Sequence, residues 1–458
     1  GLGAALTGDG IYGVLHRASD GKITLYLYNA AKTKLLYMAE TTSTKSKDVY
    51  AIVAGYWDNN AATRFDCEIS DILVAKSLGA VIGREGNVTI TKNEINGTVA
   101  LDKENYKIGD TATLTLTAAS GYPILSSLKI NGIECAGSVT EADGVKTYSF
   151  GVYDVENTID VTFTDKLNAN ITITDGAALG LNGVKFTLTN KADSNVVYEV
   201  TVDNGMIAIN NAKLGTYSVK AVLIPGTTTT GADIAINAAS LTYDASSMFR
   251  SSDGIKSATT INFGENNSIS MPSGVANYGT GVNIDTITGN VFVGTKVKFT
   301  VNELATMLAS GNDSGLGIAM FTGSGDTYTG IQFWAIEGSF ALRTMQNWGA
   351  GAFVTLGTVT DGNFTLSTTD EDWIKVANAI VGDGIYLVQQ KGTDNKLTYY
   401  FYNADKTTLL KKYETGFAYD GSDTLYGVGT YRWNTGFAYT VGDYRVATTL
   451  EGVGVTAA

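Results

Sequence analysis

The sequence of 458 residues contains few of the residue types on which several functional classes depend. It has two cysteines, Cys67 and Cys135, and a single histidine, His16, which is too few for a Cys/His zinc cluster. The two cysteines fall in different domains of the organisation derived below, so we expect no structural disulfide. His16 has no Ser or Cys near it in the sequence, and we expect it to lie on the surface.

Basic residues and long apolar runs are also scarce. Lys and Arg number 32 against 45 Asp and Glu, and the net charge is −13. Nucleic acids and anionic membranes bind basic stripes, so we expect neither as a partner. No run of 18 or more apolar residues occurs, and we therefore expect no insertion into a membrane.

The composition that is present favours β-structure. Prolines number 3 and glycines 53, and short runs rich in Thr, Val, Tyr and Ile alternate with turn residues. Only Val301–Ala309 shows a helical period, which predicts one short helix. The length predicts several domains of about 100 to 200 residues each.

One stretch occurs twice. Residues 8–37 match residues 382–411 without a gap, at an offset of 382 − 8 = 374, and 17 of the 30 positions are identical. In residues 22–28 the aliphatic side chains alternate with Thr24, Tyr26 and Tyr28, which predicts a strand with an aliphatic face and a tyrosine face. The chain thus looks like one period of a longer array.

Residues 87–166 have a pattern of their own. Gly97-Thr-Val, Tyr106-Lys-Ile-Gly-Asp110 and Thr113-Leu-Thr-Leu-Thr117 are followed by Leu128-Lys-Ile-Asn-Gly132 and Ile159-Asp-Val-Thr-Phe163. The pattern resembles the internalin B-repeat modules of bacterial surface proteins. This resemblance implies a small Ig-like sandwich that acts as a spacer.

Residues 167–236 form a third expected module. Gly183-Val-Lys-Phe-Thr-Leu-Thr189 and Gly215-Thr-Tyr-Ser-Val-Lys-Ala221 are similar to the prealbumin-like, collagen-adhesin B-type domains. Many members of that family carry a Lys–Asn isopeptide bond. The position of its lysine falls at Thr174, so we expect no such crosslink here.

Residues 237–458 contain about a dozen short candidate strands, one of them at Trp373-Ile-Lys-Val376. Their order resembles the concanavalin A-like and laminin G superfamily of jelly-roll sandwiches. We therefore expect an all-β, multidomain chain with one complete jelly roll, two small Ig-like or prealbumin-like β-sandwiches and a partial second jelly roll.

Residues 1–86 would be the C-terminal half of such a sandwich. Half a sandwich exposes an apolar face and free strand edges, which natural proteins avoid. We expect completion by the other modules, by a neighbouring copy or by residues 236–290, unless the half-domain is itself a product of truncation.

Catalytic residues are not evident. Glycosidases of this fold place two carboxylates across the scissile bond, and no strand of the C-terminal domain carries acids at such spacing. Asp370-Glu-Asp372 is expected to be a solvated loop, and the counterpart of His16 in the second copy is Gln390. We expect no enzyme, with a glycoside hydrolase fragment as the minor alternative.

Aromatic residues give the stronger indication. Sugar rings stack on exposed Trp and Tyr, and Trp334 alternates with Gln332, which suggests exposure. The competing interpretation is that these side chains are core. The candidate ligand-binding residues are Trp334, Trp348, Tyr431, Trp433, Phe437, Tyr328, and, in the first copy, Tyr56 and Trp57.

A bound metal is a weaker prediction. The laminin G resemblance implies loop carboxylates that bind calcium, and Asp326 and Asp423 are the candidate ligands. No other cofactor is expected.

The function expected from the sequence is non-catalytic binding of a polysaccharide, a starch-type glucan or a host glycan, by a secreted or surface protein of a bacterium. The alternative is a structural adhesin stalk or filament that contacts proteins, including neighbouring copies. Exposed Trp334, Trp348 and Trp433 in one groove would favour the glycan, and buried side chains would favour the stalk.

Overall fold

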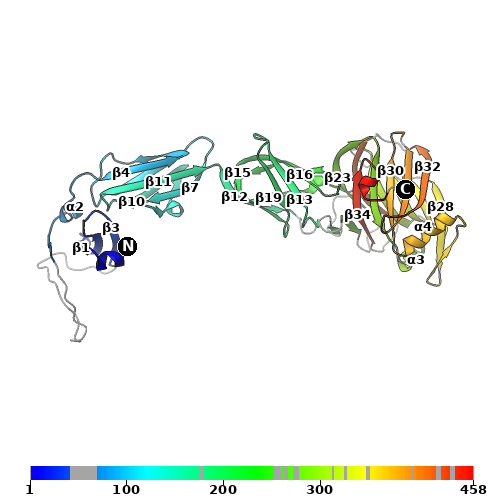
Figure 1. Ribbon diagram of the computed structural model, residues 1–458, viewed down its shortest axis with the longest axis horizontal. Coiled ribbons are helices and arrows are strands. Elements are labelled where there is room, and N and C mark those ends of the chain that lie inside the picture. The colour runs from blue at the N-terminus through cyan, green and yellow to red at the C-terminus, as the bar shows by residue number, and fades with distance from the viewer. Residues whose placement is uncertain are drawn as a thin grey trace, which may run out of the picture. The chain divides into compact units, whose positions relative to one another are not determined.

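A computed structural model describes residues 2–41, 70–174, 179–251, 260–262, 267–271, 278–311, 314–323, 327–346, 351–394, 396–418, 424–433 and 439–456. The chain forms two compact units, residues 1–166 and 167–458 (Figure 1). Nearly all regular structure is β, which confirms the all-β, multidomain fold class. The part of the chain described here holds no helix long and apolar enough to cross a membrane.

The first unit begins with a three-stranded antiparallel sheet. Helix α1 (Leu2–Thr7) precedes strands β1 (Ile11–Arg17), β2 (Ile23–Asn29) and β3 (Leu35–Glu40), which pair in that order. Thr24, Tyr26 and Tyr28 share one face of β2, as the alternation predicts, and all three are buried. Tyr26 and Tyr28 pack towards helix α2 (Leu78–Val81) and towards Ile108 and Tyr153, which lie in connecting loops further along this unit.

The rest of this unit is a small sandwich. Its strands are β4 (Thr89–Ile95), β5 (Gly97–Leu101), β6 (Thr111–Ala118), β7 (Ile124–Ile130), β8 (Ile133–Glu134), β9 (Thr140–Ala142), β10 (Val145–Gly151) and β11 (Glu156–Thr164), with the 3-10 turn η2 (Ala136–Ser138). They form the sheets β5-β6-β10-β9 and β4-β11-β7-β8. Leu114, Leu128 and Phe163 are fully buried between them.

The second unit begins with another small sandwich. Its strands are β12 (Lys166–Ile173), β13 (Lys185–Asn190), β14 (Val197–Thr201), β15 (Met206–Lys213), β16 (Gly215–Ala221), β17 (Thr229–Thr230), β18 (Ile234–Ile236) and β19 (Ser240–Tyr243). Its sheets run β15-β12-β19 and β14-β13-β16-β17, with β18 paired to β16. Because β19 pairs with β12, this module extends past the expected boundary at residue 236.

The large C-terminal sandwich follows the turn η3 (Ser246–Met248). An eight-stranded sheet has the order β20-β23-β33-β25-β26-β27-β28-β29, and a seven-stranded sheet the order β21-β22-β34-β24-β30-β31-β32. The strands are β20 (Phe249–Ser251), β21 (Thr260–Asn262), β22 (Ser268–Met271), β23 (Tyr278–Thr288), β24 (Val291–Val297), β25 (Ser314–Phe321), β26 (Tyr328–Ile336), β27 (Ser339–Gln346), β28 (Ala352–Thr360), β29 (Asn363–Leu366), β30 (Ile385–Lys391), β31 (Lys396–Asn403), β32 (Leu409–Ala418), β33 (Thr424–Trp433) and β34 (Tyr439–Ala447).

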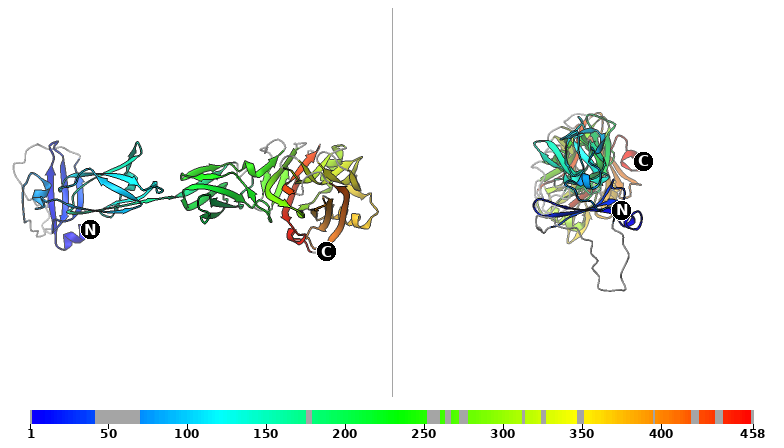
Figure 2. Two further views of the ribbon diagram at one scale, coloured as in Figure 1. Left: turned by 90° about the horizontal axis from the view of Figure 1, so that it is seen from above. Right: turned by 90° about the vertical axis from the view of Figure 1, so that its left-hand side faces the viewer.

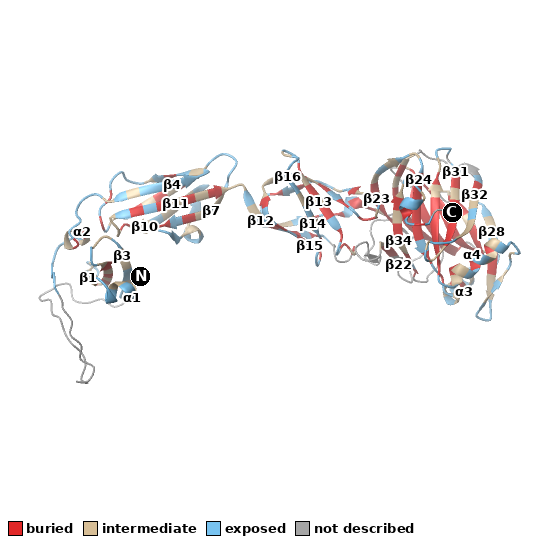
Figure 3. Cartoon of the chain, viewed as in Figure 1, coloured by how far each residue is buried: buried red, intermediate tan, exposed pale blue. Residues whose placement is uncertain are grey.

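The two sheets face each other across one core. Phe353 of the eight-stranded sheet stacks on Tyr399 of the seven-stranded sheet at 5.9 Å, and the Tyr399 hydroxyl donates to the carbonyl of Gly330. Burial raises the pKa of Tyr399, so this phenol remains a neutral donor. Figure 3 shows buried residues concentrated on the central strands of this C-terminal sandwich. The turn η4 (Glu451–Val453), red in Figure 2, contacts β24 and β34.

Two helices cover one end of this core. The predicted helix at 301–309 is confirmed as α3 (Val301–Ala309), which begins with a capping box of Thr300 and Glu303. The predicted strand at Trp373–Val376 is wrong, because this segment belongs to helix α4 (Glu371–Val381).

Capping decides the structure of that segment. Asp370 accepts hydrogen bonds from the backbone N–H groups of Asp372 and Trp373, which makes it the N-cap rather than part of a solvated loop. The side chains buried in α4 recur with helical spacing, at Trp373, Val376, Ala377 and Ile380.

Asp285 joins the small module to the large sandwich. Its carboxylate accepts from the Thr228 hydroxyl at 2.5 Å, from the Thr230 N–H at 3.0 Å and from the Thr230 hydroxyl at 2.6 Å. Lys220 pairs with it at 2.8 Å. Gly226, at φ +91°, lies so close to the Val446 carbonyl that a Cβ would be 1.9 Å from the oxygen. The two modules therefore dock through a specific set of contacts.

Candidate functional site

The described aromatic candidates lie together on the outer face of the eight-stranded sheet. Tyr328 and Trp334 are on β26, and Tyr431 and Trp433 are on β33. Strand β25 runs between them and carries Gly315 and Gly317 in this region. A Cβ on Gly317 would lie 2.8 Å from the Trp433 ring, so glycine is what leaves room for the indole.

These rings pack on one another. Tyr328 stacks on Tyr431 at 4.5 Å, and Trp334 meets Trp433 edge-on at 5.7 Å. Their exposed fractions are 1% for Tyr328, 4% for Trp334 and Tyr431, and 9% for Trp433. The Arg343 guanidinium lies 4.2 Å over the Trp334 ring. The four residues form a packed cluster and not an exposed row.

Gln332 shares this face with Trp334, as the alternation of β26 predicts, yet it is also buried. Alternation therefore assigned the face correctly but not its exposure. The remaining candidates lie outside the described residues; they are Tyr56, Trp57, Trp348, Phe437 and the calcium candidates Asp326 and Asp423. Over the described ranges, no group of three His, Cys, Asp or Glu residues could hold a metal ion.

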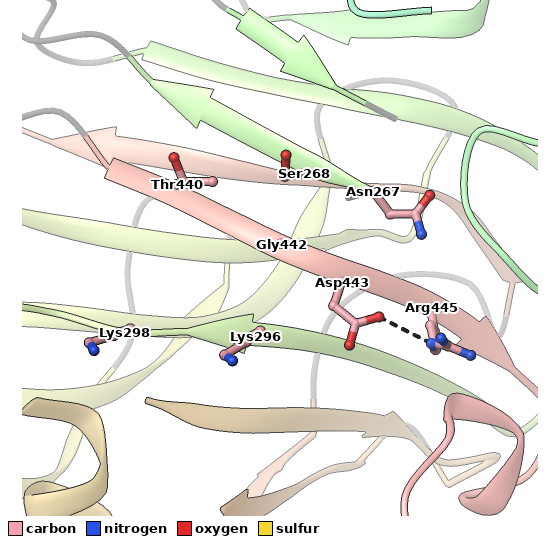
Figure 4. Close-up of a pocket in the computed structure, with 8 residues that line it drawn as sticks. All are labelled: Asn267, Ser268, Lys296, Lys298, Thr440, Gly442, Asp443 and Arg445. Atoms are coloured by element: carbon pink, nitrogen blue, oxygen red, sulfur yellow. Dashed lines mark hydrogen bonds and ion pairs between the residues drawn. The ribbon is translucent and has the colours of Figure 1, made fainter. Parts of the chain in front are cut away.

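A pocket of about 610 Å³ lies on the outer face of the seven-stranded sheet (Figure 4). Lys296 shares its face of β24 with Phe292, which packs with Tyr386 in a cluster away from the eight-stranded sheet. The residues that line the pocket come from β22, β24 and β34 and their flanks; they are Asn267, Ser268, Lys296, Lys298, Thr440, Gly442, Asp443 and Arg445.

The pocket is lined by more positive than negative side chains. Asp443 pairs with Lys406 and accepts from the Arg445 Nε at 3.2 Å, so its charge is already compensated. Lys296 and Lys298 are exposed and make no ion pair with any described residue. The pocket thus presents positive charge on a chain whose net charge is −13.

Tyr386 contacts Asp443, and its hydroxyl lies 3.3 Å from the Asp443 carbonyl oxygen. The Lys406 ammonium lies 4.2 Å over its ring, and its hydroxyl donates to the Val453 carbonyl at 3.0 Å. Burial, reinforced by the charge of Asp443, raises the pKa of Tyr386. The phenol therefore stays protonated and holds the C-terminal segment against the sheet.

The side chains that line the pocket suit contact with a polar ligand. Its amide and hydroxyl side chains, Asn267, Ser268 and Thr440, can hydrogen-bond to ligand hydroxyls, and its lysines can pair with ligand anions. Among the described residues that line the pocket, Asp443 is the one carboxylate, and it is held in ion pairs with Lys406 and Arg445.

Sequence reasoning missed this pocket because Lys296 and Arg445 lie far apart in the chain. Strand β34 pairs directly with β24 and so brings them together. The sequence offers one signal: Lys296 and Lys298 are two residues apart, which places both side chains on one face of an extended segment.

Comparison with known proteins supports no closer assignment. No protein-family model matches the sequence, and no curated protein is similar to it in sequence. Among solved structures, the exoplasmic/lumenal domain of VIP36, bound to Ca²⁺ and Man2, aligns at a TM-score of 0.26 and 10% identity, over 44% of this chain and 80% of that one.

Two further structures align at a similar level. The carbohydrate-binding module CBM66 from Bacillus subtilis has a TM-score of 0.21 and 10% identity, over 39% of this chain and 82% of that one. A protein of unknown function from Shewanella oneidensis MR-1 has a TM-score of 0.23 and 16% identity, over 39% of this chain and 66% of that one. Similarity this low assigns no ligand and no residue role to the chain.

Proposed function

We propose that the C-terminal sandwich is a non-catalytic carbohydrate-binding domain, and that its ligand carries acidic groups such as uronic acids or sulfates. The observation that carries this proposal is the pocket on the seven-stranded sheet. There Lys296 and Lys298 stand without acidic partners in the described structure, beside amide and hydroxyl side chains.

The chemistry of the lining favours a sugar with charge. Hydroxyl groups of a sugar exchange hydrogen bonds with Asn, Ser and Thr side chains, and carboxylates or sulfates pair with lysine. Because the net charge of the chain is negative, an anionic ligand would be favoured at a local positive site such as this one. The smaller β-modules would act as spacers, and the composition supports a secreted or surface location on a bacterium.

Titration calorimetry of the intact chain tests this proposal. Oligogalacturonate and a sulfated oligosaccharide are expected to bind, with affinity that falls as salt rises, while a neutral maltooligosaccharide binds more weakly. The double substitution Lys296→Ala and Lys298→Ala should lower the affinity about tenfold, at roughly 0.2 to 1 kcal/mol for each exposed ion pair.

Lys375→Ala is the matched control, because Lys375 is also exposed but lies on α4 and pairs with Asp372. It should leave the affinity unchanged. Equal binding of charged and neutral oligosaccharides, or no effect of the double substitution, would reject the acidic ligand.

A second function has its own support. The burial of Trp334 and Trp433 favours a structural stalk or filament over stacking of sugars on these two rings. If no glycan binds and sedimentation shows association through the sandwich, the stalk is the better assignment.

A further inference from the structure

The sheet β1-β2-β3 repeats the geometry of β30-β31-β32. Ile11 pairs with Asn29 and Arg17 with Ile23, as Ile385 pairs with Asn403 and Lys391 with Leu397. The third strand repeats as well: Thr24 pairs with Glu40, Thr398 pairs with Glu414, and each copy has its irregularity at the equivalent place. At the same offset, α1 corresponds to the last six residues of α4, 376–381.

In both copies, the same kinds of side-chain contact hold a later segment of the chain against the outer face of the sheet. The Tyr12 hydroxyl donates to the Val81 carbonyl at 3.1 Å, as Tyr386 does to Val453. The Lys32 ammonium lies 4.0 Å over the Tyr12 ring and pairs with Asp71 at 2.6 Å. The same Lys–Tyr–Asp arrangement is made by Lys406, Tyr386 and Asp443. The two copies are therefore equivalent in their contacts and not only in sequence.

The inner faces differ in what covers them. In the C-terminal copy, Gln389, Tyr399 and Phe401 are fully buried under the eight-stranded sheet. Their counterparts are Leu15, Leu25 and Leu27. Leu15 is 74% exposed, and Leu25 and Leu27 are only partly buried. Tyr37, which pairs with Leu27 on this face, is 49% exposed. An apolar sheet face of this kind marks an interaction site.

Among the described residues, one strand edge is also unpaired. Strand β30 pairs with β31 on one side and with β24 on the other, from Val291–Lys391 to Val297–Ile385. Its counterpart β1 pairs with β2 and with no further strand among the described residues. A free edge beside an apolar face can accept one strand of an incoming polypeptide.

We propose that the sheet β1-β2-β3 binds a polypeptide that folds like residues 249–374 of this chain. Such a polypeptide would add a strand like β24 along Ile11–Arg17 and would lay its eight-stranded sheet on the apolar face. In the C-terminal copy, Phe353 and Trp373 contact Tyr399 and Phe401. Their equivalents in the occupant would cover Leu25 and Leu27. This proposal is independent of carbohydrate binding.

A joined chain tests the proposal. A second copy of residues 249–374 is placed ahead of Gly1 of the full chain, which reproduces the offset of 374 between the two sheets. Hydrogen exchange of the β1 amides is expected to slow at least tenfold relative to the unmodified chain, and binding of an apolar dye should fall. Unchanged exchange and dye binding would overturn the proposal.

Two substitutions show which face is used. Leu15→Asp in the joined chain should restore fast exchange of β1, because it places a charge on the covered face. Met38 is also an exposed apolar residue, but it pairs with Tyr26 on the opposite face, so Met38→Asp should leave the protection intact. Equal effects of the two substitutions would contradict the assignment of the face.

Sedimentation of the unmodified chain tests another occupant. If the chain is a dimer that Leu15→Asp makes monomeric, then a second whole copy covers the face and the proposal is wrong. A monomeric chain whose β1 becomes protected only when residues 249–374 are joined supports it.

Discussion

The substitution Asp285→Ala removes the side-chain contacts that this carboxylate makes between the small module and the large sandwich. Every hydrogen bond and ion pair described above for this carboxylate reaches across to Lys220, Thr228 or Thr230 of the other module. Alanine cannot replace any of them, whereas the fold of either module keeps its own core.

The size of the effect follows from the exposure of the group. Hydrogen bonds to a charged group contribute about 1.5 to 3 kcal/mol each when water is excluded. The Asp285 side chain is 31% exposed and that of Lys220 53%, so water and salt replace part of what is lost. We expect the docking of the two modules to weaken by about 2 to 3 kcal/mol, or roughly one charged hydrogen bond in a dry site.

Hydrogen exchange of the amides of Thr230 and Lys220 measures this docking locally, without requiring that the whole chain unfold in one step. Asp233→Ala is the matched control, because Asp233 also pairs with a lysine, Lys191, and that pair is exposed within its own module. It should change exchange by less than about 0.5 kcal/mol. If Asp285→Ala changes exchange no more than Asp233→Ala, then this carboxylate does not hold the modules together.

Three further predictions follow from single contacts. Gly226→Ala should weaken the docking of the two modules by about 2 to 4 kcal/mol, because alanine is strained at positive φ and would clash with Val446. Gly362→Ala is the control: Gly362 has φ +75° in open space, so this change should cost about 1 kcal/mol in its own turn. Hydrogen exchange measures both effects. Asp370→Ala should destabilise the sandwich by about 1 kcal/mol, because α4 loses its N-cap. Asp372→Ala should destabilise it by less. Urea unfolding followed by Trp fluorescence should show the lower midpoint of the Asp370 variant. Burial raises the pKa of Asp285, but hydrogen bonds from Lys220, Thr228 and Thr230 outweigh this effect and hold the pKa below the ordinary 3.8. The contribution of Asp285 to docking is therefore present above pH 3.8 and is lost as the pH falls below it. Hydrogen exchange of the Thr230 amide at a series of pH values measures this loss.

The sequence predicts those features that depend on neighbours along the chain. Alternation placed Thr24, Tyr26 and Tyr28 on one face of β2, and the spacing of apolar residues identified α3. The prediction of a strand at Trp373–Val376 was wrong, because a short apolar-rich run fits a strand as well as a helix. The N-cap Asp370, whose side chain accepts hydrogen bonds from the backbone, favours the helix. Capping residues before short apolar runs therefore carry more information than the runs themselves.

Features that depend on distant segments were beyond prediction. Alternation places Trp334 and Gln332 on one face of β26, but the burial of that face depends on what packs over it. The positive pocket arises from β24 and β34, whose pairing is a property of the sheet order and not of either strand. Periodicity assigns faces, and topology decides which faces meet.

The contacts that hold residues 451–456 against the seven-stranded sheet have a mechanical consequence. Tension applied at Thr456 would first load the hydrogen bond from its own N–H to the Lys406 carbonyl, at 3.0 Å, and then the buried Val453 and its bond from Tyr386. These contacts lie on the outer face of the sheet, so they would yield one after another before β34 is pulled from β24 and β22. The segment is therefore positioned to absorb extension while the core of the sandwich stays closed.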